Sequence, residues 1–275
     1  MTDTLKSLVS VSTVRIASRL VRFIILVAVF IGLSAPAAAG EISPHRALYE
    51  VTMDGPAQNI DDAVGLLSVE ISRSCEQWTY NQRFELKLIQ EGSDLGDFRF
   101  RLTAWESLDG QRYGFHSTKS QGDESAFKLI GRGDIRQDGT SVVRYTEPAA
   151  FERDLPEVVL FPVGWLKAGL AASKDGQKRF SGFVFMGASL DEPLRVNSII
   201  VSADIVKEAE PLLQGPRWRH LSAFYNQASA EVPEYEAEET VLANGVLAGA
   251  LIRYPAYALQ IKLQRIEALP DPQDC

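Results

Sequence analysis

The chain has 275 residues, a formal net charge of −8 and a hydrophobic content of 45%. This composition is typical of a folded domain with a substantial core, and the acidic balance disfavours nucleic acid and anionic membrane surfaces as partners. The chain has two cysteines, Cys75 and Cys275, so it is not a scaffold held together by many disulfides.

Residues 1–39 have the pattern of a cleaved Sec signal peptide. Basic residues precede the apolar run FIILVAVFIGL, and the small residues SAPAAAG follow it, which places the expected cleavage between Ala39 and Gly40. The apolar run is shorter than the roughly 20 residues that a membrane-spanning helix needs, although an uncleaved N-terminal anchor stays an alternative. We therefore expect a periplasmic protein in which residues 40–275 form a single β-domain.

From residue 47 onward the sequence predicts one antiparallel strand after another. In residues 78–88, apolar side chains recur mostly at every second position, which places them on one face of a strand. Asp-Gly pairs at 109–110 and 138–139 predict tight turns between such segments. Other segments that alternate in this way include 47–53, 64–72 and 98–105.

One segment breaks this alternation and predicts a helix over residues 162–174. Val163, Leu166 and Leu170 recur at helical spacing, Pro162 suits the first turn, and a glycine follows the last turn. We expect this helix to lay an apolar stripe on the sheet.

Two later stretches carry further information about the sheet. Residues 180–186, FSGFVFM, are apolar on both faces, which predicts a sheet wrapped around the helix or around a cavity where an acyl chain would bind. Residues 231–239, EVPEYEAEE, predict a solvated strand face and turn in preference to a cation site. Asn244-Gly245 then predicts the last hairpin. The chain is therefore predicted to be mainly β, with one substantial helix.

Catalytic and metal-binding motifs are not evident in the sequence. The histidines His45, His116 and His220 lack the close spacing of a zinc site. Ser125 and Lys128 match a Ser-x-x-Lys motif, but in a strand residues three apart point to opposite faces. We therefore predict no enzymatic activity, no metal and no cofactor, and we assign no ligand-binding residue. An unrecognised envelope hydrolase is the weakest of the functional alternatives.

The two cysteines predict a disulfide between Cys75 and Cys275, because the periplasm is oxidising and one pair has a single intramolecular connectivity. This bond would hold the C-terminal tail against an early strand. A redox-active pair is the alternative, but the chain has no Cys-x-x-Cys motif.

Several local patterns occur along the chain: the Cys75…Trp78 strand entry, LP followed by LFP within 155–162, PEYE at 233–236, NGV at 244–246, EAL with Pro270, and Cys275. Together they resemble one known family, the EipB family of periplasmic proteins that maintain the cell envelope. The resemblance covers the whole of the expected mature chain. It implies a curled antiparallel β-sheet (a β-spiral or incomplete barrel) with one helix packed on it, similar to the Lol-type lipoprotein carriers.

The resemblance also implies a function and the same pairing of Cys75 with Cys275. We expect a non-enzymatic periplasmic factor that maintains envelope integrity by binding a protein partner, which the resemblance suggests is a periplasmic tetratricopeptide-repeat protein. The alternative is a Lol-like carrier that binds a lipid acyl chain or lipoprotein anchor in the cavity of the curled sheet. Neither hypothesis involves nucleic acid or a transmembrane span in the mature chain.

Overall fold

The computed structural model describes residues 42–55, 57, 60–90, 93–122, 124–156, 159–190, 192–206, 208–226 and 231–272. Within these ranges one 15-stranded sheet forms, together with the α-helix α2 and the short 3-10 helix η1. No helix in the described ranges is long and apolar enough to cross a bilayer. The elements are β1 (His45–Met53), β2 (Asp62–Arg73), β3 (Gln77–Gln90), β4 (Ser93–Ser107), β5 (Arg112–Gln121), β6 (Phe127–Ile135), β7 (Ser141–Glu147), β8 (Phe151–Leu155), β9 (Val159–Leu160), α2 (Pro162–Lys174), β10 (Arg179–Val184), β11 (Leu194–Val206), η1 (Pro211–Leu213), β12 (Gly215–Tyr225), β13 (Tyr235–Leu242), β14 (Leu247–Arg253) and β15 (Ala258–Ala268).

The first and last strands lie side by side in the middle of the sheet. The strand order runs from β8 down to β1, continues with β15, and then descends to β9. Neighbouring strands pair antiparallel except β9 and β10, which are parallel. The predicted antiparallel sheet is confirmed, and the predicted helix over residues 162–174 coincides with α2.

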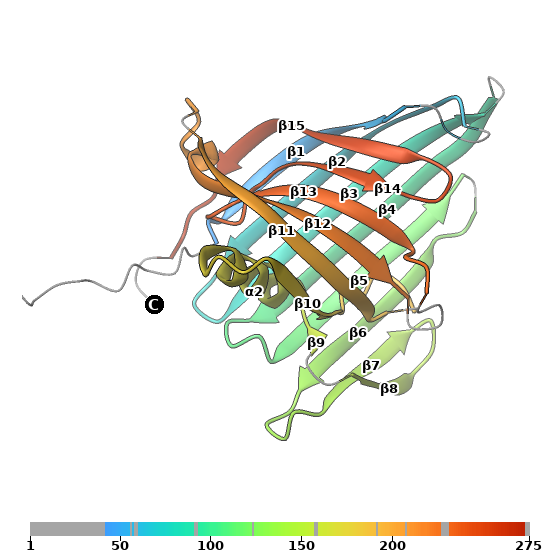
Figure 1. The fold of residues 1–275 in the computed structure, drawn as a ribbon. Coiled ribbons are helices and arrows are strands. Elements are labelled where there is room, and N and C mark those ends of the chain that lie inside the picture. The colour runs from blue at the N-terminus through green and yellow to red at the C-terminus, as the bar shows by residue number, and fades with distance from the viewer. Residues whose placement is uncertain are drawn as a thin grey trace, which may run out of the picture. The chain divides into compact units, whose positions relative to one another are not determined.

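The sheet curls until its two ends meet through side-chain contacts. Figure 1 shows β11 and β12 crossing over β5 and β6. The Tyr113 hydroxyl donates to the carbonyl oxygen of Met186 at 2.6 Å, and the Ser117 hydroxyl donates to that of Gly187, also at 2.6 Å. Both acceptors lie just after β10, so this segment is held against the inner face of β5. The predicted curled sheet, an incomplete barrel, is thereby confirmed.

Strand β10 is covered on both faces at its C-terminal end, as its sequence predicts, whereas Arg179 and Ser181 nearer its start are exposed. On one side Phe183 packs against an aromatic cluster that includes Phe115, Phe161 and Phe185. On the other side Val184 faces the interior of the barrel. The strand therefore lies between a closely packed aromatic core on one side and the interior of the barrel on the other.

The aromatic core needs two glycines on β6, where the rings press against the strand. A Cβ atom on Gly133 would lie 2.8 Å from the ring of Phe161, and one on Gly131 would lie 2.7 Å from that of Phe115. Real Cβ contacts are longer than this, so the bare backbone makes room for both rings.

Helix α2 begins at a cap supplied by a distant strand. The residue before the helix, Phe161, offers no side-chain acceptor. Instead the carboxyl group of Glu106, at the end of β4, accepts the backbone N–H groups of Val163 and Gly164, each at 2.8 Å. These bonds satisfy donors that have no partner within the helix and favour a negative charge at its N-terminus. Burial nevertheless raises the pKa of Glu106 to about 7. The cap fixes α2 against one end of the curled sheet.

Candidate functional site

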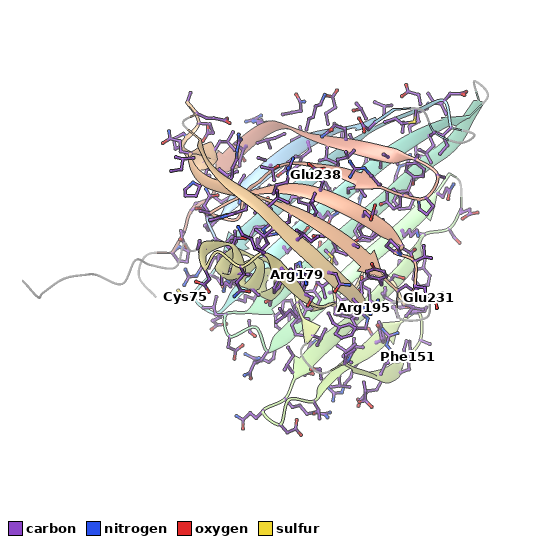
Figure 2. The ribbon with its side chains drawn as sticks, in the orientation of Figure 1. Cys75, Phe151, Arg179, Arg195, Glu231 and Glu238 are labelled. Atoms are coloured by element: carbon purple, nitrogen blue, oxygen red, sulfur yellow. The ribbon has the colours of Figure 1, made fainter. Side chains whose placement is uncertain are left out.

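An apolar cavity of about 620 Å³ lies inside the curled sheet. Its floor is formed by α2 through Val163, Leu166 and Gly169. At the opposite end the cavity is lined by Lys119 and Glu234, which are exposed, so this end is its mouth. Figure 2 shows the two ends of this arrangement: Cys75 lies at the α2 end and Glu231 at the other. The volume lies within the roughly 300–1,000 Å³ of small-molecule sites.

Inward-facing side chains change in character along β3, from the floor of the cavity to its mouth. Trp78 packs with α2 at the floor. Tyr80 and Gln82 follow as polar residues, and Phe84 comes next toward the mouth. Phe98 and other aromatic and aliphatic residues complete this outer part of the lining.

Strands β12 and β13 show the same change from apolar to polar side chains on the other side of the cavity. Trp218 belongs to the cluster at the floor, as does Val241. His220 and Glu239 are direct partners in the register of these two strands and come next. We call the resulting ring of lining residues the polar belt. It consists of Tyr80, Gln82, His220, Ser222 and Glu239.

Most members of the polar belt have a hydrogen-bond partner inside the protein. The Tyr80 hydroxyl donates to Oε1 of Gln82 at 2.9 Å. Nε2 of His220 lies 2.8 Å from Oγ of Ser173, and the hydroxyls of Ser222 and Ser198 are 2.7 Å apart. Glu239 differs from the others, because no hydrogen bond or ion pair among the described residues involves its carboxyl group.

The surroundings of Glu239 disfavour its charged form. Burial raises its pKa to about 7, with no donor or cation acting in the opposite direction. The surface that Glu239 keeps exposed faces the cavity, since the residue lines it. An acid of this kind is a candidate ligand-binding group, because the cost of burying it is not offset within the protein.

The neighbouring residue on the same strand, Glu238, behaves in the opposite way. Its carboxyl group lies on the outside of the sheet, 3.2 Å from Arg219 and 3.7 Å from Arg253 (Figure 2). The interpretation of residues 231–239 as a solvated face is therefore right for Glu238 and wrong for Glu239. The alternation of Tyr235, Ala237, Glu239 and Val241 is a signal that could have identified the inward acid.

The residues singled out in the sequence are only partly brought together. Cys75 lies in the turn between β2 and β3, whereas Cys275 lies outside the described residues, as do Ala39 and Gly40. The disulfide and the cleavage site therefore stay predictions. His45 is buried and lines the cavity near α2, and burial lowers its pKa.

The remaining candidate motifs have no catalytic arrangement. His116 is exposed on β5, while Ser125 precedes β6 and Lys128 lies within it, so the Ser-x-x-Lys pair is not on a helix. Among the described residues no group of three or more His, Cys, Asp or Glu side chains could hold a metal ion.

Comparisons with known proteins agree with this geometry. Residues 36–270 match the family model described as EipB-like. The chain is 23% identical over 250 residues to the cell envelope integrity protein EipB of Brucella abortus (strain 2308), a match that covers 86% of this chain and 88% of that protein. A crystal structure of a beta-barrel-like protein of domain of unknown function DUF1849 from Brucella abortus has a TM-score of 0.76 at 21% identity, covering 84% of this chain and 100% of that one. This likeness supports the curled-sheet fold.

Proposed function

Because this chain belongs to the EipB-like family, we propose that it is a non-enzymatic periplasmic factor of envelope maintenance that shelters the hydrocarbon chain of an amphiphile. The name of the Brucella relative supports a role in envelope integrity. The signal-peptide pattern of residues 1–39 supports export to the periplasm. The interior cavity supports the binding of an apolar chain.

The single observation that carries this proposal is the cavity, which is closed at its floor and open at one end. Aromatic and aliphatic side chains dominate its outer part, among them Phe84, Phe98, Phe100 and Ile252. Each methylene group buried against such a lining contributes about 0.8 kcal/mol. A chain of about twelve carbons therefore gains enough from burial to bind without covalent attachment.

Hydrogen bonding at the floor supports a non-enzymatic role. The hydroxyl of Ser173 donates to the carbonyl oxygen of Gly169 at 2.8 Å, which commits its proton to the helix. With the Ser173 proton directed to Gly169, the 2.8 Å contact with Nε2 of His220 requires the tautomer in which His220 is the donor. A serine nucleophile needs the reverse arrangement.

Filling the cavity should abolish ligand binding without unfolding the protein. Val69 faces the cavity from β2 and is not fully buried, so a tryptophan there would take up empty space. We expect Val69→Trp to weaken the binding of dodecanol at least tenfold in calorimetric titration. The matched control is Leu66→Trp on the outer face of the same strand, where the side chain is 51% exposed. Equal dodecanol binding by both variants would contradict the proposal. It would also be contradicted if protein purified from the periplasm carried no bound ligand and the wild type bound no dodecanol in the titration.

A groove on the outer face supports a second candidate function, the binding of a protein partner. The groove is about 750 Å³ in volume and runs across β1 to β5. Within it Arg83 lies directly opposite Arg101, a pairing of like charges that is destabilising in a sheet. Among the described residues, the one ion pair of Arg101 is distant, at 3.9 Å from Glu85. An acidic segment of a partner would offset this repulsion.

Charge reversal in the groove tests this second candidate. With a purified periplasmic tetratricopeptide-repeat protein of the same organism as the probe, Arg83→Glu should weaken binding at least tenfold in biolayer interferometry. Arg195→Glu, which lies on β11 outside the groove (Figure 2), should leave it unchanged. A partner that binds the Arg83 variant as tightly as the wild type does not use this groove.

A further inference from the structure

We infer that the amphiphile enters the cavity polar group first, and that this group is a primary amine held by the carboxyl group of Glu239. The inference rests on the proposed function and adds to it the chemical class of the ligand and the direction in which it binds. It assigns Glu239 as the residue that recognises the ligand.

Glu239 has no partner for its carboxyl group among the described residues, whereas its neighbours in the polar belt each have one. Removing a carboxylate from water without a hydrogen bond or counter-charge is costly, and buried acids are ordinarily paired. The other members of the polar belt each make a hydrogen bond to a protein side chain. A bound ammonium group would supply to Glu239 both the donor and the opposite charge, in the form of a charge-assisted hydrogen bond.

The position of the polar belt sets the direction of binding. The belt lies between the cluster at the α2 floor and the aromatic residues toward the mouth. A ligand that entered with its tail first would place its hydrocarbon chain against the belt and its polar group near Lys119 and Glu234 at the mouth, which leaves Glu239 without a counter-charge. A ligand that entered with its polar group first would bring that group to Glu239 and lay its chain against Phe84 and Phe98.

The groups that face Glu239 carry no positive charge near pH 7. His220 lies across from it on β12, Tyr80 faces it from β3, and Tyr235 precedes it on β13. Burial lowers the pKa of His220 and raises the pKa of both tyrosines, so all three are neutral near pH 7. None of these neighbours supplies a positive charge.

The other titratable groups of the lining lie further away or are already bonded. Lys119 and Glu234 are at the mouth, where the Lys119 ammonium lies 5.5 Å from the centre of the Phe98 ring. Glu192, whose pKa burial also raises to about 7, accepts three backbone N–H groups in the segment after β10. His45, near the floor, has a pKa lowered by burial. The cation that Glu239 lacks must therefore come from the ligand.

The experiment compares three probes that share a twelve-carbon chain: dodecylamine, dodecanol and dodecanoate. Titrations at pH 8, below the micellar concentrations, measure the binding of each to the full mature protein. We expect dodecylamine to bind at least tenfold more tightly than dodecanoate. Glu239→Gln should remove at least tenfold of the dodecylamine affinity and leave dodecanol within about twofold. Glu238→Gln, the outward-facing neighbour, is the matched control and should change none of the three.

The pH dependence gives an independent readout with a defined sign. Pairing with an ammonium needs ionised Glu239, so the dodecylamine affinity should rise as the pH passes from 6 to 8. The dodecanoate affinity should fall over the same interval, because the ionised acid repels a second carboxylate. Both trends should disappear in Glu239→Gln. This result would show that the pH dependence arises from Glu239 and not from Glu192, whose pKa is raised to a similar value.

The outcomes distinguish this inference from the proposed function. Equal binding of all three probes, unaffected by Glu239→Gln, would overturn the inference and leave the proposed function intact. A preference for dodecanoate would overturn it as well. If none of the probes binds, both fail. Circular dichroism of the Gln variant, compared with the wild type, shows whether a loss of binding reflects unfolding.

Discussion

Replacing Glu192 with alanine is expected to lower the free energy of unfolding by about 3 kcal/mol, because three backbone donors, one buried and two part-buried, lose their acceptor at once. Its carboxyl group accepts the backbone N–H groups of Met186, Gly187 and Ala188 at 2.9, 2.6 and 3.2 Å. The residue is 4% exposed, so water replaces these bonds poorly. In a domain of this size the loss corresponds to a fall in Tm of roughly 6–12 °C.

The loss of stability in Glu192→Ala should be large because the segment after β10, which contains the three donors, joins the two ends of the sheet. Arg153 of β8 donates to the carbonyl oxygen of Leu190 at 2.6 Å and also to that of Glu192. Met186 and Gly187 accept the hydroxyls of β5. Loss of the carboxyl group would free the segment and expose the aromatic core behind it. The curl of the sheet would then depend on the remaining contacts of β9 and α2.

Thermal and urea unfolding at pH 8 provide the measurement, with two companion variants. Glu152→Ala is the matched control, because it removes an acid of β8 whose ion pair with Arg144 is at the surface. It should change the stability by less than about 1 kcal/mol. Glu192→Gln keeps an acceptor oxygen and should lose about half as much as the alanine variant. A Glu192→Ala protein as stable as Glu152→Ala would show that the segment does not hold the sheet closed.

The sequence predicts the strands and the helix well because each has a periodicity of its own. The alternation of residues 78–88 lies within β3, and the spacing of Val163, Leu166 and Leu170 coincides with α2. Such patterns are local consequences of one face being buried. The curl of the sheet was predicted only in outline, from residues 180–186 being apolar on both faces and from the family resemblance. It depends on contacts between distant elements, such as the one between Tyr113 and Met186.

The candidate site was harder to predict, because its residues are set by tertiary neighbours. Glu239 and Glu238 are adjacent acids in an acidic stretch, and only the phase of their strand separates them. Glu106 continues the inward alternation of Leu102 and Ala104 on β4, but its partners are backbone donors 57 and 58 residues away that only the fold brings within reach. Glu192 lies outside the strands, and its donors are four to six residues before it in the chain. Composition therefore identifies the acids but not which of them are inside.

The proposed bond between Cys75 and Cys275 would join the turn after β2 to the C-terminal tail. The strand register places the end of β2, which precedes Cys75, close to the end of β15, which precedes the C-terminal tail. His45 pairs with both Ile71 near the end of β2 and Ala268 at the end of β15, so these strand ends lie at one edge of the sheet. The N–H of Leu269 donates to the carbonyl oxygen of Pro44 at 3.0 Å, which fixes the chain there.

The C-terminal tail after β15 is long enough to reach from the end of that strand to the turn that holds Cys75. Cys75 follows Ile71 by four residues in the turn before β3, at the same edge. Neighbouring strands are about 4.8 Å apart. The chain from Leu269 to Cys275 has six Cα–Cα steps, which can span about 20 Å when extended. Cys275 therefore does not need to displace any strand in order to meet Cys75.

Cys75→Ser should lower the free energy of unfolding by about 2–5 kcal/mol, since the bond would close a loop of about 200 residues and restrict the unfolded chain. The expected fall in Tm is about 10 °C, with the β-sheet circular dichroism unchanged. Wild-type protein treated with dithiothreitol should unfold like the variant, while the variant itself should not respond to the reductant. The oxidised wild type should also weigh about 2 Da less than its reduced form, since one disulfide replaces two thiols. If the untreated protein has the full thiol mass, or if reduction leaves its Tm unchanged, the C-terminal tail is not held by a disulfide. In that case the register of β1 with β15 and the contact between Leu269 and Pro44 would have to hold this edge of the sheet together on their own.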